Sequence, residues 1–172
     1  MTDCPICELV TDKSLTLFED EHVVGLVASE PVAPGHIIVV SKQHAPILEA
    51  IPDAVVRRMV VVANKLSMAV FEAVGAQGTN LLIQNGLPAG QAKPHCMVHI
   101  IPRREGDNLK LEWQPGSVSE DESGKAELLL KDAAQSIGKG EKEKPKPLEE
   151  RKAEHIELSE TDYRLKALRR IP

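Results

Sequence analysis

The pattern of hydrophobic and polar positions changes along the chain and predicts several strands and one long helix. Residues 16–30 contain two short apolar runs joined by the acidic turn 19–21, which is typical of a hairpin. The β-branched run 36–42 indicates a central strand buried on both faces. From 53 to 74, apolar residues recur every three or four positions and stop at Gly75, so this segment is predicted to be an amphipathic helix.

Two further strands are predicted after the long helix. Residues 79–84 and 97–102 are short apolar runs, and the glycine- and proline-containing segment 85–90 between them is typical of a turn. A shorter strand is expected at Leu109–Trp113. Strands therefore lie on both sides of one long helix in the sequence.

The character of the chain changes near residue 117. Ser119–Glu122 has the pattern of a helix cap and predicts a helix to about residue 137. Residues 138–147 alternate in charge and contain few apolar residues, which predicts an exposed linker. A second capping pattern at Ser159–Asp162 precedes either a docked arm or a loose helix. We therefore expect a domain at 1–116, a helix at 117–137, and a charged linker with a C-terminal arm at 138–172.

The composition limits the class of protein. Of 172 residues, 42% are hydrophobic and 27% are charged, which is ordinary for a soluble globular protein. No apolar run reaches the roughly 18 residues that a membrane span needs, and the first residues do not resemble a signal peptide. We therefore expect a cytoplasmic protein that does not enter membranes. The net charge of −5 argues against sequence-independent binding of nucleic acid.

Two of the three cysteines stand close together as Cys4-Pro5-Ile6-Cys7. In a chain without an export signal, this spacing favours a metal site or a redox pair over a structural disulfide. A thioredoxin-like pair would follow a strand and begin a helix within a βαβ unit, whereas this pair stands near residue 1. A metal site is the better interpretation, and it requires two more ligands.

A second group of chemically active residues lies at 95–99. If this segment is a strand, alternate side chains share a face, so His95, Met97 and His99 point to one side and Cys96 and Val98 to the other. Just before it, the segment 84–91 contains glycines that allow backbone N–H groups to approach an anion. Histidines beside such a turn are typical of a phosphate site.

These residues resemble the histidine triad (HIT) family. Its signature, His-φ-His-φ-His-φ-φ with apolar φ and often a following Pro-Arg, corresponds here to His95–Arg103. Two blocks upstream, Pro31–His44 and Gln84–Gln91, match the family's pattern in the same order. The resemblance covers roughly residues 4–115.

The resemblance implies an α+β, HIT-like fold with an antiparallel sheet of about five strands and a long helix, here followed by a C-terminal helical extension. It implies a homodimer whose sheet continues across the subunits, and a purine nucleotide bound through its phosphate. In active members the middle histidine attacks the α-phosphorus and forms a nucleotidyl-histidine, which water then cleaves.

Position by position, the resemblance assigns His99 to the third histidine, which supports the nucleophile. It assigns phosphate and ligand contacts to the glycine-rich segment and its neighbours: Gln84, Gly86, Gly90, Gln91 and His99. The nucleophile position holds Met97, whose thioether is a poor nucleophile toward phosphorus. Ala28 stands where the family usually has a ribose-binding Asp or Asn, and Ala92 where it often has Ser or Thr.

A zinc-containing subgroup of the family supplies the missing metal ligands. The resemblance places two thiolates and two imidazoles around one ion: Cys4, Cys7, His44 and His95. A four-ligand site has no open position, so the zinc is expected to be structural. Among the other candidates, we expect His36 to bond a turn, His22 and His155 to lie on the surface, and Cys96 to be a buried apolar residue.

Two functions remain open. The first is a HIT-derived protein that binds a purine nucleotide or another small ligand and is catalytically inactive or strongly attenuated, because Met97 replaces the nucleophile. The alternative is a nucleotidyl hydrolase or transferase that acts on nucleoside phosphoramidates or dinucleoside polyphosphates. Met97 favours the first function, whereas His99 and the glycine-rich segment are compatible with the second.

Overall fold

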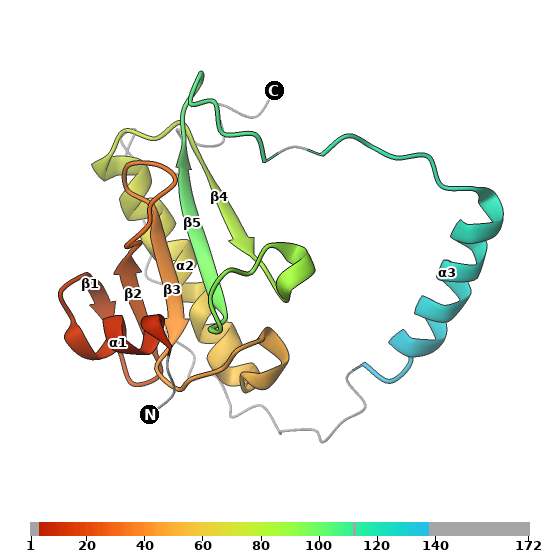
Figure 1. Cartoon of the computed structure of the whole chain (residues 1–172), viewed down its shortest axis with the longest axis horizontal. Coiled ribbons are helices and arrows are strands. Elements are labelled where there is room, and N and C mark those ends of the chain that lie inside the picture. The colour runs from red at the N-terminus through yellow and green to blue at the C-terminus, as the bar shows by residue number, and fades with distance from the viewer. Residues whose placement is uncertain (1–3, 112, 138–172) are drawn as a thin grey trace, which may run out of the picture. The chain divides into compact units, whose positions relative to one another are not determined.

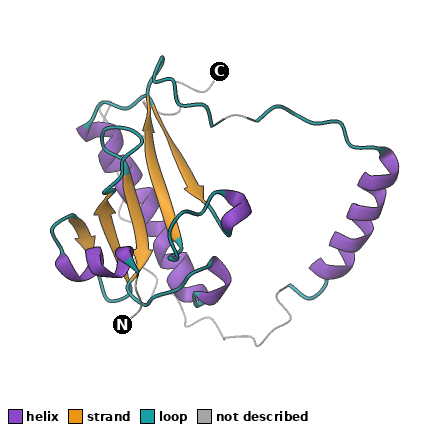
Figure 2. Ribbon diagram, in the orientation of Figure 1, coloured by secondary structure: helices purple, strands orange, loops and turns teal. Residues whose placement is uncertain are grey.

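The computed structural model describes residues 4–111 and 113–137, which fall into two units, 4–108 and 109–137. The first unit has an antiparallel sheet of five strands in the order β1-β2-β3-β5-β4, so β1 and β4 form its edges (Figures 1 and 2). The strands are β1 (Thr16–Glu19), β2 (Val23–Val27), β3 (Ile37–Ser41), β4 (Gly78–Ile83) and β5 (Met97–Arg103). The helices of this unit are α1 (Pro5–Asp12) and α2 (Asp53–Ala73), with short 3₁₀ turns at Leu48–Ala50 and Leu87–Ala89.

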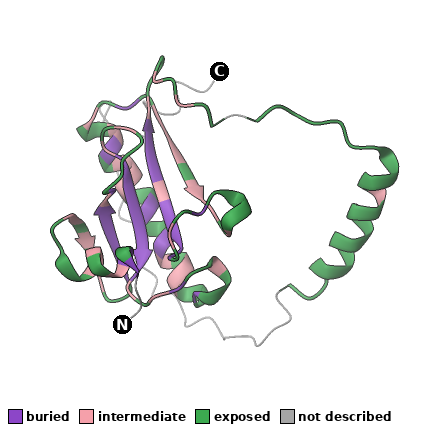
Figure 3. Cartoon of the chain, in the orientation of Figure 1, coloured by how far each residue is buried: buried purple, intermediate pink, exposed green. Residues whose placement is uncertain are grey.

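The two faces of the sheet carry separate hydrophobic clusters. One cluster packs α2 against the sheet, and its fully buried members include Val39, Ile100 and Met59. The other packs α1 against the opposite face and includes Leu26 and Val40. Burial on both faces explains why β2 and β3 consist mainly of β-branched and other apolar residues (Figure 3).

The long helix fits closely over the middle of the sheet. Its buried residues, Met59, Val62, Ala63 and Val70, recur with helical spacing. Gly25 of β2 lies directly beneath it, where an added Cβ would lie 2.5 Å from Leu66 Cδ1. A larger residue at Gly25 would therefore have to displace the Leu66 side chain from its place between α2 and the sheet.

Most of the predicted elements of this unit are confirmed. The central strand, the long helix and the strands at 79–84 and 97–102 form within one or two residues of the predicted bounds, and the hairpin forms with its second strand ending at Val27, three residues before the predicted end. The prediction of a strand at Leu109–Trp113 is wrong, because Leu109–Leu111 and Trp113 belong to no strand. Trp113 is 85% exposed, and none of the strands that the structure describes pairs with this segment to supply a ladder.

The second unit contains α3 (Glu120–Ala134), which confirms the helix predicted after residue 117. Ser119 Oγ accepts a hydrogen bond from the Glu122 backbone N–H, and the Glu122 side chain accepts from the Ser119 N–H, so the capping box is complete. No helix among the described residues combines the length and the apolar character needed to cross a membrane. The predicted linker, the second capping pattern and His155 lie outside the described residues, and the division into three parts stays a prediction.

Candidate functional site

Four metal-ligating side chains meet where α1 lies against the sheet. The ligand atoms of Cys4, Cys7, His44 and His95, here called the metal cluster, all lie within 4.8 Å of one another. Cys4 caps α1 and Cys7 lies in its first turn, whereas His44 follows β3 and His95 precedes β5. Residues 91 positions apart in the sequence are thus brought together, as the resemblance predicts.

The separations within the metal cluster fit one tetrahedral ion. His95 Nδ1 lies 3.7 Å from Cys4 Sγ and 3.6 Å from Cys7 Sγ. His44 Nδ1 lies 3.4 Å from Cys7 Sγ. A tetrahedral zinc with bonds of about 2.3 Å to sulfur and about 2.0–2.1 Å to nitrogen would separate S and N by about 3.6 Å. The donor set and its geometry can therefore hold a metal ion.

His95 is oriented toward this site by a backbone carbonyl. The Nε2 atom lies 3.1 Å from Ser41 O, an atom that can only accept, so Nε2 carries the proton and Nδ1 presents its lone pair to the cysteines. The His95 side chain is fully buried, and burial lowers its pKa. His95 is therefore neutral, which is the form that binds metals.

Met97 lies on the same face of the sheet as the metal cluster. It pairs with Val40 across β3 and β5, is 8% exposed, and packs in the cluster that contains Cys4 and Ile38. Cys96 and Val98 belong to the opposite cluster, which confirms the predicted alternation. The middle position of the motif thus holds a side chain with no titratable proton.

His99, one strand repeat beyond Met97, forms a pair with His36, called here the His36–His99 pair. His36 Nδ1 accepts a hydrogen bond from the Val32 N–H at 3.3 Å, so His36 carries its proton on Nε2. That Nε2 lies 3.1 Å from His99 Nδ1 and donates to it. His99 Nδ1 is therefore the acceptor, and its own proton lies on Nε2. The prediction that His36 bonds a turn is confirmed, whereas its contact with His99 was not predicted.

Burial keeps both rings of the pair neutral. Burial, and to a lesser degree repulsion from His99, lowers the pKa of His36 from 6.5 to about 4. Burial also lowers the pKa of His99. At neutral pH the pair is thus an uncharged chain of hydrogen bonds that begins at the Val32 N–H.

Acidification is expected to destabilise the fold through His36. Because its pKa is about 4 when folded and near 6.5 when unfolded, the unfolded chain binds more protons between these values, and stability falls as the pH is lowered. The slope is about 1.4 kcal/mol per pH unit for one such group. Urea unfolding of the natural chain and of His36→Gln at pH 7 and pH 5 checks this. Equal pH dependence of the two proteins would contradict it, since the metal cluster is the same in both.

The glycine-rich loop, residues 84–91, lies between β4 and β5. Gly86 and Gly90 have φ of 91° and 84°, a conformation that favours glycine. Gln84 Nε2 donates to Ala89 O at 3.2 Å, and a Cβ on Gly90 would lie 2.6 Å from that same nitrogen. Gln84, the first residue after β4, therefore holds the end of the loop close to its beginning.

Gln91 closes this loop from inside. Its Oε1 accepts from the Gly86 N–H at 2.8 Å. Its Nε2 donates to Pro46 O at 2.6 Å and to Lys93 O at 3.0 Å. The side chain is only 9% exposed, so in this structure Gln91 orders the loop, and the predicted contact with a phosphate stays a prediction.

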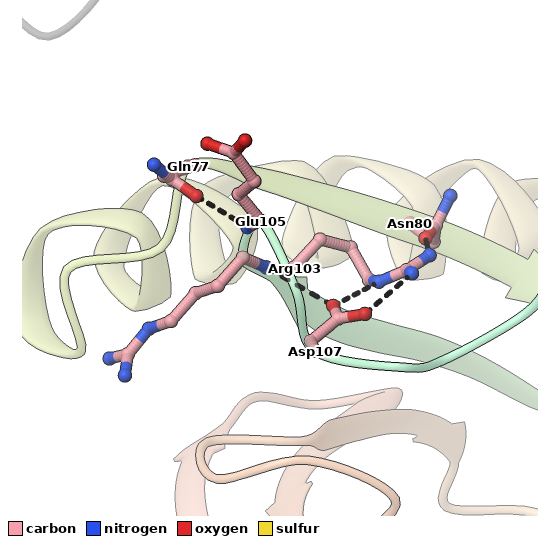
Figure 4. A network of polar contacts seen from close by, with 6 residues as sticks. Gln77, Asn80, Arg103, Glu105 and Asp107 are labelled. Carbon is pink, nitrogen blue, oxygen red and sulfur yellow. Dashed lines mark hydrogen bonds and ion pairs between the residues drawn. The ribbon is translucent and has the colours of Figure 1, made fainter.

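The far end of β5 is fixed by the arginine of the motif. Arg103 donates through Nε and Nη2 to the Asp107 carboxylate at 2.7 and 3.0 Å, and through Nη1 to Asn80 Oδ1 of β4 at 2.7 Å (Figure 4). The Glu105 N–H donates to Gln77 in the same network. The Arg103 guanidinium therefore links β5 to β4 and to the following turn. These hydrogen bonds stabilise the strand that carries Met97 and His99.

The remaining candidates lie where predicted or add detail. His22 is exposed and Cys96 is fully buried, as expected. Ala28 is buried beside Met97 in the α1 cluster, whereas Ala92 is exposed. The sequence pattern did not predict a role for Asn85. Its side-chain amide donates to Glu49 and accepts from the Leu48 N–H, so it connects the loop to the turn before α2.

Comparison with known proteins identifies the family. The HIT domain model matches residues 11–106. The chain is 38% identical over 109 residues to Adenylylsulfatase HINT3 of Arabidopsis thaliana, an alignment that spans 62% of this chain and 55% of that protein, so the chain matches about half its length. It is 28% identical over 138 residues to Bis(5'-nucleosyl)-tetraphosphatase [asymmetrical] of Schizosaccharomyces pombe, covering 73% of this chain and 76% of that protein.

Solved structures have the same fold. A HIT family member from Bacillus subtilis superposes with a TM-score of 0.68 at 25% identity, covering 76% of this chain and 96% of its own. A Zn-bound histidine triad family protein from Mycobacterium smegmatis superposes with a TM-score of 0.59 at 31% identity, covering 77% and 97%. The α+β fold, the matched residues and the ordered motifs agree, and the chain belongs to the HIT family.

Proposed function

We propose that this chain binds the phosphate of a nucleotide beside β5 and holds it without covalent catalysis. The observation that carries the proposal is Met97, which occupies the middle position of the motif with its thioether packed in an apolar cluster. A covalent intermediate needs a nucleophile that can attack phosphorus, and a thioether does not supply one. His95, on the same face, is oriented toward the metal cluster by Ser41.

His99 acts as a hydrogen-bond donor in this proposal. Its Nδ1 is the acceptor for His36, which leaves the proton on Nε2, and no partner for that nitrogen is found among the described residues. A neutral N–H beside the glycine-rich loop suits a phosphate oxygen. It cannot attack phosphorus, because the lone pair needed for attack is absent from Nε2 in this tautomer.

The metal cluster is proposed to bind one structural zinc ion. Two thiolates neutralise its charge in a buried site, and His95 and His44 complete four-fold coordination. The similar fold of the Zn-bound histidine triad family protein from Mycobacterium smegmatis supports this assignment. Bound zinc would supply a cross-link between α1 and the segments that flank β3 and β5.

Nucleotides are the proposed ligand class. Relatives of the chain are named as an adenylylsulfatase, a bis(5'-nucleosyl)-tetraphosphatase and a bis(5'-adenosyl)-triphosphatase, and each name specifies a nucleotide. These names also favour the alternative function, a nucleotidyl hydrolase or transferase. In that alternative His99 would attack, which requires its proton to move to Nδ1. The proton of His36 would then have to move from its Nε2 to its own Nδ1. That Nδ1 could no longer accept the hydrogen bond from the Val32 N–H.

Equilibrium binding tests the proposed function. We expect the zinc-loaded chain to bind one nucleoside monophosphate per subunit in titration calorimetry. Gly90→Val is expected to weaken binding at least tenfold, because a β-branched residue is strained at the φ of 84° and its Cβ would displace the Gln84 amide that bonds the loop. Gly116→Val is the control, since no atom lies within 4 Å of an added Cβ at that position. Absence of saturable binding by AMP and GMP would contradict the proposal.

We further propose a homodimer formed through an edge of the sheet. β4 pairs on one side only among the described strands, and its Leu81 is 50% exposed. An unpaired strand edge with an exposed apolar residue favours association with a second copy. Light scattering at micromolar concentration is expected to give the mass of a dimer, also after truncation at Gly138, and Leu81→Lys is expected to shift it toward the monomer. A monomeric natural chain would contradict the dimer.

A further inference from the structure

The two cysteines of the metal cluster stand on the same turn of α1. Cys4 is the N-cap residue, and the Glu8 N–H donates to Cys4 O at 3.3 Å, which closes the first turn around Cys7. The two Sγ atoms lie within 4.8 Å of each other. Cα atoms three positions apart on a helical turn are about 5 Å apart, within the range of roughly 4.4–6.8 Å that a disulfide joins. Rotation of the two side chains can therefore bring the sulfurs into bonding distance while α1 stays in place.

The three cysteines differ in their access to solvent. Cys7 is partly exposed, whereas Cys4 beside it is only 1% exposed. Cys96 is fully buried and belongs to the hydrophobic cluster on the opposite face of the sheet. A small oxidant dissolved in water can therefore reach Cys7 and find a second sulfur next to it, but it cannot reach Cys96.

Metal binding also gives the cysteine pair its reactive form. A thiol that coordinates a cation is deprotonated, and the thiolate is the form that reacts with peroxides. The other two ligands, His44 and His95, carry no sulfur. The half of the metal cluster that belongs to α1 can thus be oxidised, whereas the half that flanks β3 and β5 cannot.

We propose that Cys4 and Cys7 form a peroxide-sensitive switch whose oxidation releases the metal ion. This inference rests on the proposed zinc site. The Cys7 thiolate attacks one oxygen of hydrogen peroxide, the O–O bond breaks, and a sulfenic acid and one hydroxide form. The Cys4 thiolate then attacks the Cys7 sulfur, which forms the S–S bond and expels a second hydroxide. Two thiolates and one hydrogen peroxide thus give one disulfide and two hydroxide ions, and two electrons pass from sulfur to oxygen.

Oxidation removes a long-range cross-link and leaves a local one. A disulfide offers no thiolate, so the site keeps two imidazoles, which are too few for a closed tetrahedral site. The ion is proposed to join Cys4 to His95, 91 positions away, whereas the disulfide joins residues of one turn. A cross-link across so short a loop restrains the unfolded chain little. After oxidation α1 is therefore held by packing alone, in the cluster that also contains Met97.

Hydrogen peroxide added to the zinc-loaded full chain tests the proposal. A chromogenic chelator measures the zinc released, and peptide mass spectrometry after alkylation locates the oxidised sulfurs. We expect one zinc ion per chain to be released together with the loss of alkylation at Cys4 and Cys7, while Cys96 stays alkylatable after unfolding. The melting temperature is expected to fall to that of the metal-free chain. A thiol reductant followed by zinc is expected to restore it.

Cys7→His is the matched variant, because it keeps four ligands of the kinds that zinc binds but lacks the second thiol. It is expected to release zinc at least about tenfold more slowly than the natural chain at the same peroxide concentration. Cys96→Ala is expected to release zinc at the rate of the natural chain.

The outcomes separate the switch from the zinc site on which it rests. A natural chain that keeps its zinc in peroxide, or loses it without a Cys4–Cys7 disulfide, overturns the switch and leaves the metal site standing. Equally fast release from Cys7→His also overturns the switch. A natural chain that binds no zinc in the reduced state overturns the metal site itself.

Discussion

Met97→His is expected to give the chain nucleotidyl-transfer chemistry, raising hydrolysis of an adenosine phosphoramidate by at least about 10³-fold. The new imidazole would stand on β5 beside His99 and near the glycine-rich loop, where the bound phosphate is proposed to lie. The His36–His99 pair already forms and leaves an N–H beside this position. Full activity is not expected, because Ala28 and Ala92 still lack the polar groups usual at those positions.

Met97→Leu is the matched control for this gain, since leucine fills a similar volume and has no nucleophilic atom. Steady-state assays of both variants, after removal of contaminating hydrolases, provide the measurement. A folded, zinc-loaded Met97→His protein that binds nucleotide yet remains inactive would show that position 97 does not face the phosphorus atom.

Loss of the metal is expected to have the largest effect on stability. His44→Ala should release the ion and lower the free energy of unfolding by on the order of 4 kcal/mol, or roughly 10–20 °C in melting temperature. The reason is that the ion joins segments that are far apart in the sequence: α1, the residues after β3 and those before β5.

His22→Ala is the control for this prediction, because His22 is an exposed histidine outside the metal cluster. Metal analysis and thermal unfolding followed by circular dichroism compare the two variants. A natural chain that purifies without metal and melts at the same temperature after addition of zinc would refute the structural role.

The strands and α2 could be predicted because their patterns are local. The β-branched run of β3 and the three- and four-residue spacing of α2 each reflect a buried face, and both elements form as expected. By contrast, α1 was not predicted, since eight residues are too short for a clear period. Pro5 at its first turn and the spacing of Ile6, Leu9 and Val10 were the available signals.

The residues of the candidate site could likewise be predicted only in part from local sequence. The Cys4–Cys7 spacing indicates half of a metal site, whereas His44 and His95 were identified only through the family resemblance. The His36–His99 contact joins residues 63 positions apart and depends on the register that pairs Ile38 with His99. This contact has no signature in the local sequence.

Intact-protein mass spectrometry of the natural chain, incubated with an adenosine phosphoramidate and with GMP as a binding control, tests the central claim most directly. We predict saturable GMP binding, no covalent adduct, and no release of AMP, because Met97 supplies no nucleophile and His99 holds its proton on Nε2. An increase in mass by one adenylyl group, or steady release of AMP that His99→Ala abolishes, would contradict the account.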